Sequence, residues 1–180
     1  MAIDRQNYCG IALPLPAHAD LIQPFRQAHI ATPATAVKMH ITLVSPFVNG
    51  ADLNEAHLAR LAAFFAAAAP FNVMLAGFGR FPGVLYLTPE PTAPLLALTA
   101  ALLRAFPGAA PDFPEHVFHA TLAQGSGLDL DAVEAAFVRA HGALLPIRER
   151  IDHAVLYEKR AGVWSVRATF AFEGEPTGLP

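Results

Sequence analysis

The sequence predicts an α+β fold of two similar lobes, in which two antiparallel sheets flank a central cleft and the helices lie on the outside. Two observations lead to this prediction. Segments with strand patterning alternate with helical segments in the same order in both halves of the chain, and one short histidine-containing motif occurs once in each half. The repeat is far longer than a solenoid period, so it indicates two pseudo-symmetric lobes. We expect residues 1–180 to form one two-lobed domain.

The first half begins with a predicted strand, Tyr8–Leu13, followed by a helix that Pro16 opens and that runs to about Ala28, since proline suits a first helical turn. The predicted elements that follow are the strand Val37–Leu43, the loop Ser45–Asp52, the helix Glu55–Ala69 capped by Asn54, and a hairpin of Phe71–Phe78 and Val84–Thr88 with its turn at Gly79, Pro82 and Gly83.

The second half repeats this order of elements. Its predicted elements are the helix Ala93–Phe106, the loop Pro107–Pro114, the strand Val117–Ala123, a helix capped by Asp129 or Asp131 and ending at His141, and the strands Ile151–Glu158 and Val163–Phe172. The charged run from Arg148 to Arg150 reads as a solvated turn.

Composition narrows the class of protein and the kind of partner. Hydrophobic residues make up 54% of the chain and charged residues 15%, which favours a compact protein with a large core. A net charge of −3 argues against a duplex nucleic acid as partner, because such binders carry a basic face, but it is compatible with a small anionic ligand.

Cysteine content and apolar patterning bear on location. Cys9 is the single cysteine, and the first residues lack the pattern of a secretion signal, so we expect a cytoplasmic protein. The apolar run Leu61–Ala69 is too short to span a bilayer, and we expect no membrane association. We also expect a monomer.

The repeated motif is His-x-Thr-Leu. It occurs as His40-Ile41-Thr42-Leu43 and as His119-Ala120-Thr121-Leu122, 79 residues apart. Side chains on a strand alternate between two faces, so each motif presents one imidazole and one hydroxyl to the same side. A lone histidine on a strand is usually structural, but recurrence at matching places in a duplicated chain favours a shared functional site.

These residue types suit displacement at phosphorus. The reaction needs a base for the attacking oxygen and an acid for the leaving oxygen, on opposite sides of the phosphorus atom. His40 and His119 are the candidates for these roles because imidazole exchanges a proton near pH 7, and the pseudo-twofold leaves both assignments open. The hydroxyls of Thr42 and Thr121 are candidate donors to the nonbridging phosphate oxygens. A zinc site is the competing interpretation, but the motifs supply two imidazoles and no carboxylate or thiolate at ligand spacing, so we expect no metal.

At these residues the chain resembles the two-histidine (2H) phosphoesterase superfamily, which includes the 2′-5′ RNA ligases and the RNA 2′,3′-cyclic phosphodiesterases. The segments His40–Phe47 and Phe78–Leu87 and the closing strand around Trp164 are also similar to that family. The resemblance implies a bilobal fold with a central cleft, no cofactor, and hydrolysis or reversible formation of a 2′-linked phosphoester. It assigns His40 and Thr42 to the first family motif and His119 and Thr121 to the second.

One departure from the family pattern bears on the substrate. Members that act on RNA often carry a basic residue soon after the second motif, where this chain has Gln124-Gly125. We therefore expect a metal-independent phosphodiesterase that opens a 2′,3′-cyclic phosphate or a related small nucleotide phosphodiester, with an RNA end as a further candidate ligand. The alternative is a non-catalytic module that holds a nucleotide or RNA end through the same four residues.

Several other residues have a structural and a functional reading. Lys38 could reach a phosphate or be solvated. Phe47 and Tyr86 could stack on a base, but aromatic residues at such places are more often core. His116 reads as a loop residue, and a structural role is expected for the remaining histidines, which are His18, His29, His57, His141 and His153.

Overall fold

The computed structural model describes residues 3–30, 37–109, 111–112 and 117–175. Within these described residues, eight strands form two four-stranded sheets, and the strands of each sheet pair in antiparallel fashion. The first sheet has the order β2 (His40–Asn49), β1 (Tyr8–Pro14), β7 (His153–Arg160), β8 (Val163–Ala171). The second sheet has the order β5 (Ala120–Gln124), β4 (Val84–Glu90), β3 (Phe71–Phe81), β6 (Ile147–Ile151). Two short 3₁₀ turns, Gly50–Asp52 and Gly142–Leu144, complete the elements.

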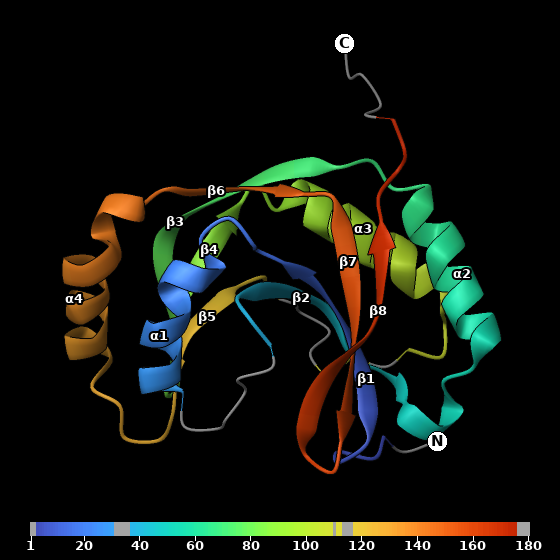
Figure 1. Cartoon of the computed structure of the whole chain (residues 1–180), viewed down its shortest axis with the longest axis horizontal. Helices are drawn as coiled ribbons and strands as arrows, with labels where there is room; N and C mark the ends of the chain where they lie inside the picture. The colour runs from blue at the N-terminus through green and yellow to red at the C-terminus, as the bar shows by residue number, and fades with distance from the viewer. Residues whose placement is uncertain (1–2, 31–36, 110, 113–116, 176–180) are drawn as a thin grey trace.

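The strands that carry the two motifs occupy equivalent positions. β2 and β5 are each an edge strand of their sheet, and these two edges contact one another where the sheets meet (Figure 1). His40 is the first residue of β2, and His119 immediately precedes β5. The two motifs are thereby brought together from opposite sheets.

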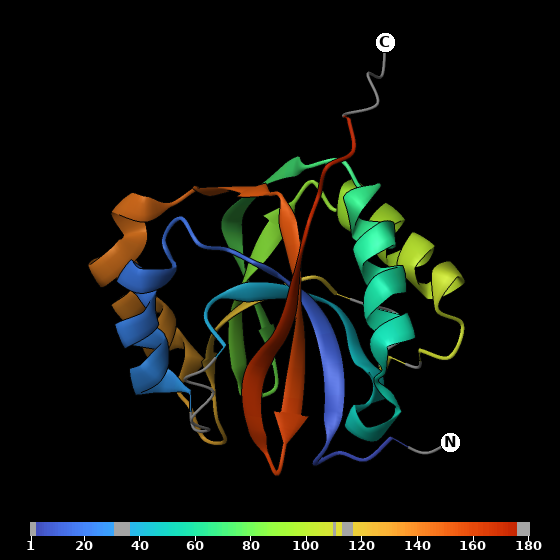
Figure 2. The same cartoon turned by 45° about the vertical axis from the view of Figure 1, so that its right-hand side comes forward.

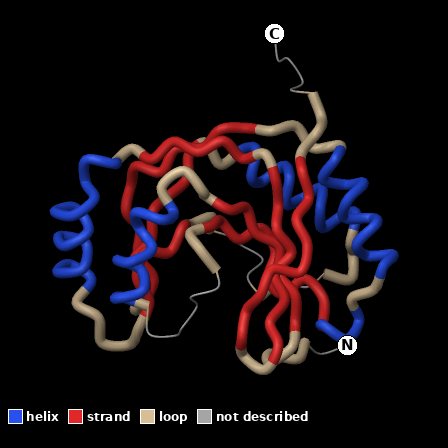
Figure 3. Tube along the Cα trace, in the orientation of Figure 1, coloured by secondary structure: helices blue, strands red, loops and turns tan. Residues whose placement is uncertain are grey.

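Four helices cover the outside of the sheets, as the sequence predicts. α2 (Glu55–Ala66) packs on β8 and α3 (Ala93–Ala105) on β2, while α1 (Ala19–His29) packs on β5 and α4 (Leu130–His141) on β4. Figure 2 and Figure 3 show these two helix pairs on opposite sides of the strands. Within the described residues, no helix combines the length and apolar character that a bilayer crossing requires.

The connections exchange helices between the sheets. α1 joins two strands of the first sheet but packs against β5 of the second, and α3 joins two strands of the second sheet but packs against β2 of the first. One hydrophobic cluster therefore includes residues of both sheets and of all four helices, among them Ile22, Phe65, Leu102 and Phe137. The exchange places side chains of α1 beside both histidine motifs.

The α+β, two-sheet prediction is confirmed, but the lobes do not coincide with the halves of the chain. The segments Ile151–Glu158 and Val163–Phe172 were predicted as the end of the second half, whereas β7 and β8 complete the first sheet. Antiparallel pairing of β7 with β1 joins strands from opposite ends of the chain. Such a closure depends on long-range packing that the order of elements does not encode.

The solvated turn predicted for Arg148 to Arg150 is wrong, because these residues form β6. In this strand Ile147, Glu149 and Ile151 are buried, while Arg148 and Arg150 are exposed. The Glu149 side chain is 3% exposed and accepts hydrogen bonds from the Ala17 N–H at 3.0 and 3.2 Å. Burial alternates with a period of two along this strand, which pairs with β3. The strand was not predicted from sequence because three of its residues are charged.

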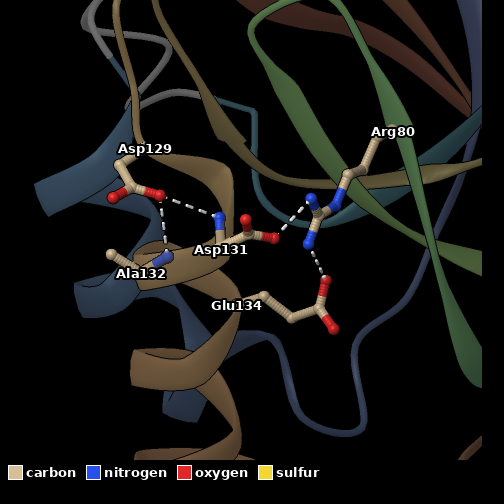
Figure 4. A network of polar contacts seen from close by, with 5 residues as sticks. All are labelled: Arg80, Asp129, Asp131, Ala132 and Glu134. Carbon is tan, nitrogen blue, oxygen red and sulfur yellow. Dashed lines mark hydrogen bonds and ion pairs between the residues drawn. The ribbon is translucent and has the colours of Figure 1, made fainter.

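Helix capping agrees with the sequence. The Asn54 side chain accepts the His57 N–H at 3.1 Å, and Asp129, rather than Asp131, caps α4 by accepting the N–H groups of Asp131 and Ala132. Arg80 of β3 then pairs with Asp131 at 2.7 Å and Glu134 at 2.8 Å (Figure 4). These contacts join α4 to the second sheet.

Several predicted boundaries moved. The strand of the first motif begins at His40 rather than Val37, the second helix ends at Ala66 rather than Ala69, and the strand of the second motif is Ala120–Gln124 rather than Val117–Ala123. The first helix begins at Ala19 rather than Pro16, and the strand of the first motif continues to Asn49, through residues predicted as a loop. Pairing of Val48 with Cys9 and of Asn49 with Tyr8 extends that strand, which is a consequence of its neighbour in the sheet.

Candidate functional site

A cavity of about 200 Å³ lies where the two sheets meet. Its lining residues come from both sheets and from the end of α1, and they are Gly10, Ile11, Ala12, Arg26, Ile30, Val37, His40, Thr42, Ser45, Thr121, Gln124, Tyr157 and Trp164. Three of the four residues predicted from the motifs are therefore in one cavity, although they come from strands of different sheets. Small residues on β1 line the cavity beside the first motif.

His119, the fourth predicted residue, lies within electrostatic reach of this cavity. Its positive charge acts on the titration of His40, and Thr121, two residues further along, lines the cavity. The His119 ring packs against the rings of Phe81 and Tyr86, with centroids 5.2 and 5.1 Å away. These aromatic contacts restrict the orientation of the imidazole.

Both histidines make the same backbone contact. His40 Nδ1 lies 2.8 Å from the Lys38 carbonyl oxygen, and His119 Nδ1 lies 2.7 Å from the Val117 carbonyl oxygen. A carbonyl oxygen only accepts, so Nδ1 carries the proton in both rings and Nε2 is the atom whose protonation changes. The matched contact two residues upstream gives both imidazoles the same tautomer, and a proton can then be gained or lost at Nε2.

The surroundings of His40 favour its neutral form. Burial lowers its pKa to about 4, and the positive charges of Arg26 and His119 act in the same direction, while the hydrogen bond to the Lys38 carbonyl opposes them. An imidazole that is partly removed from water loses part of the hydration that stabilises its charged form. His40 is therefore neutral near pH 7 in the ligand-free protein, with Nε2 able to accept a proton.

Arg26 connects the second motif with the segment that leads into the first. This arginine of α1 is 3% exposed; its Nε donates to the Thr121 carbonyl at 2.9 Å, and its Nη1 donates to the Val37 carbonyl at 3.2 Å and to Gln23 Oε1 at 2.8 Å. Burial lowers its pKa, but a guanidinium remains charged in proteins. Among the described residues that line the cavity, Arg26 is the only lysine or arginine, so it supplies the fixed positive charge of the site.

Sequence reasoning missed Arg26, although a signal was present. Ile22, Phe25 and Arg26 follow the spacing of one helical face, and all three are buried. An arginine on the apolar face of a helix needs partners for its donors, and here two backbone carbonyls and a side-chain amide provide them. Tyr157 and Trp164, which line the cavity from β7 and β8, were also absent from the predicted site.

The other residues with two readings are placed outside the cavity. Lys38 is exposed and pairs with Asp20 at 2.6 Å. Phe47 is a core residue, and Tyr86 is 6% exposed and packs on His119, so the core reading holds for both. None of the cavity-lining residues is one of the histidines expected to be structural, which are His18, His29, His57, His141 and His153, and His116 lies outside the described residues.

The described residues contain no cluster of three or more His, Cys, Asp or Glu side chains arranged to hold a metal ion. The donors that converge at the cavity are instead imidazole, hydroxyl and guanidinium groups. These groups match an anion, which accepts hydrogen bonds and carries charge opposite to the guanidinium.

The chain resembles several solved structures over nearly its whole length. E. coli LigT complexed with 3′-AMP is 16% identical with a TM-score of 0.61, covering 92% of this chain and 98% of that one. A crystal structure of a phosphoesterase is 19% identical (TM-score 0.57; 93% and 99% covered), and TT0787 of Thermus thermophilus is 16% identical (TM-score 0.58; 93% and 99% covered). At these identities the likeness concerns the fold.

Family membership is decided by sequence. No curated protein sequence matches the chain significantly. A sequence model of the 2′-5′ RNA ligase superfamily does match, over residues 13–163, a range that includes both histidine motifs, Arg26 and every described strand except most of β1 and β8. With this match and the two-sheet fold shared with LigT, the chain belongs to the 2′-5′ RNA ligase superfamily of two-histidine phosphoesterases.

Proposed function

We propose that this protein is a metal-independent phosphodiesterase that opens a 2′,3′-cyclic phosphate or a related small nucleotide phosphodiester, with His40 and His119 as its acid–base pair. The observation that carries the proposal is the electrostatic coupling of two imidazoles of matched tautomer, together with a buried arginine that contacts the second motif and the segment leading into the first. Crystal structures of E. coli LigT include complexes with 3′-AMP, ATP and NADP+. Those ligands support a nucleotide-sized substrate here.

The surroundings of His40 favour it as the base. Its Nε2 is neutral and removes a proton from water as the water oxygen bonds to phosphorus. The bond from phosphorus to one ribose oxygen then breaks, and protonated His119 donates its Nε2 proton to that leaving oxygen. Each turnover leaves His40 protonated and His119 neutral, and proton exchange with solvent restores the starting state.

The remaining groups hold the phosphate. Arg26 neutralises its negative charge, and because its Nε and Nη1 are held by protein acceptors, the guanidinium is fixed before the ligand arrives. The hydroxyls of Thr42 and Thr121 donate to the nonbridging oxygens from opposite sheets. The positions of these charges and donors are set by the fold, so little reorganisation accompanies the reaction.

The test is hydrolysis of the four nucleoside 2′,3′-cyclic monophosphates with a chelator present, with products identified as 2′- or 3′-phosphates. His40→Ala and His119→Ala should each lower the turnover number by roughly 10² to 10⁴. His153→Ala is the matched control, because His153 lies beside Asp152 and does not line the cavity. Tight nucleotide binding with no hydrolysis of any substrate would instead support the non-catalytic module.

A further inference from the structure

Trp164 is the feature of the cavity that the acid–base chemistry does not use. It is the chain's single tryptophan and lies on β8, the strand of the first sheet furthest from β2. Its side chain is half-buried and lines the same cavity as His40 and Thr42. An aromatic side chain thus lines the same cavity as the polar groups of the motifs.

An apolar patch connects the His40 side of the cavity with Trp164. The Tyr157 ring lies 6.0 Å from the His40 ring, and Tyr157 forms a small cluster with Ala12, Val37 and Val155 that is separate from the main core. Trp164 packs against this cluster. The cavity lining therefore includes both a charged group, Arg26, and an aromatic ring, Trp164, which match the phosphate and the base of a nucleotide.

Neighbouring side chains hold the indole in place. The Tyr8 ring meets it edge to face, with centroids 5.2 Å apart and an interplanar angle of 85°. The Lys159 ammonium group lies 5.5 Å from the Tyr8 centroid and 6.0 Å from the Trp164 centroid, and it donates to the Arg5 carbonyl at 3.1 Å. A restrained ring loses little freedom when a ligand stacks on it, and the nearby cation favours an anionic ligand.

We infer that Trp164 is a stacking platform for the nucleobase of a nucleotide whose phosphate lies at Arg26 and the two histidines. The inference rests on the proposed function for the phosphate end alone. A core role does not account for the position of Trp164, because Val163 and Val166 beside it on β8 are 69% and 57% exposed and its apolar partners face the cavity. Because every nucleobase has an aromatic face, the platform should bind all of them, and purines, which have the larger ring system, should bind more tightly than pyrimidines.

The single tryptophan makes the inference directly measurable. Adenosine 2′-monophosphate should quench the intrinsic tryptophan emission with a saturable curve, and its Kd should match the value from isothermal titration calorimetry. Inorganic phosphate, which has no base, should displace the nucleotide in calorimetry without quenching the emission directly.

The variant Trp164→Leu keeps an apolar side chain but removes the aromatic face. It should raise the Kd for adenosine 2′-monophosphate about tenfold to a hundredfold, which is the usual effect of losing one base–aromatic stack, and leave the Kd for inorganic phosphate within about twofold. Trp164→Phe should restore most of the affinity. Val166→Leu is the control, because it changes an exposed neighbour on the same strand.

These binding measurements separate the two proposals. If Trp164→Leu is folded by circular dichroism and binds adenosine 2′-monophosphate as the wild type does, the stacking platform is refuted, whatever the hydrolysis assay shows. An equal loss of phosphate and nucleotide affinity in Trp164→Leu also refutes it, because the effect is then not confined to the base. A wild type that binds and stacks the nucleotide but opens no cyclic phosphate refutes the enzyme and retains the platform.

Discussion

The protonation of His40 gives the sharpest test of how this site works. Imidazole in water has a pKa of about 6.5, and burial together with the charges of Arg26 and His119 lowers that of His40 to about 4. This difference corresponds to about 3 kcal/mol in favour of the neutral ring, and at pH 7 it leaves about one His40 in a thousand protonated. The acid limb of kcat/KM, which reports the free enzyme, should therefore lie well below the pH at which an exposed histidine titrates.

The assay is an NMR titration of the histidine ring protons between pH 3 and 8, with the His40 signal assigned by its absence in His40→Gln. The midpoint should lie near pH 4 in the free protein and rise when inorganic phosphate is added, because the anion stabilises the imidazolium. Arg26→Met should also raise it by removing a positive charge, whereas Arg104→Met, at an exposed position on α3, should not. A free-protein midpoint at or above 6.5 would refute the base role assigned to His40.

The same shift predicts how stability depends on pH. Between about pH 6.5 and pH 4 an unfolded His40 binds a proton that the folded one does not, so acidification favours the unfolded chain. The stability that the neutral His40 ring contributes is fully present above pH 6.5, and it is lost as the pH falls through the pKa of His40 in the folded protein. In urea unfolding, the wild type should lose up to about 3 kcal/mol more than His40→Gln across this window.

Four further predictions concern the catalytic pair, the threonine hydroxyls, the metal requirement and the core. The His40→Ala/His119→Ala double variant should be hardly slower than the slower single variant, because the two groups act as a unit. A double variant whose loss in turnover equals the product of the two single losses would contradict this. Thr42→Val or Thr121→Val should slow turnover less than either single histidine variant, since each hydroxyl is one of several donors. Hydrolysis should persist in EDTA, because the motifs offer too few metal ligands; activity lost in EDTA and restored by zinc or manganese would overturn this. Phe65→Ala should lower the free energy of unfolding by about 3–5 kcal/mol in urea titrations, because this fully buried ring stacks on Phe170 and Phe172, with turnover of the folded fraction unchanged.

Local sequence patterns determined much of this protein. The alternation of apolar and polar residues and the placement of Asn54 and Asp129 predicted the main elements, since strand and helix periods and end caps depend on residues close together in the chain. The recurrence of His-x-Thr-Leu led to His40 and His119, and its two-residue period predicted that each imidazole shares one side of its strand with a hydroxyl. These features can be predicted from sequence because each depends on residues that are close together in the chain.

Tertiary structure decided what gathers around the motifs. Arg26 reaches the Thr121 carbonyl, 95 residues away, only because α1 crosses to the opposite sheet. Glu149 is buried because β6 pairs with β3 and brings it to the Ala17 N–H, and Trp164 lines the cavity because β8 closes the first sheet at its far edge. The run of charges suggested solvent for Glu149, and Arg26 was not singled out from the sequence, since local patterns do not specify which distant backbone group will solvate a buried charge. That choice follows from how the sheets and helices pack.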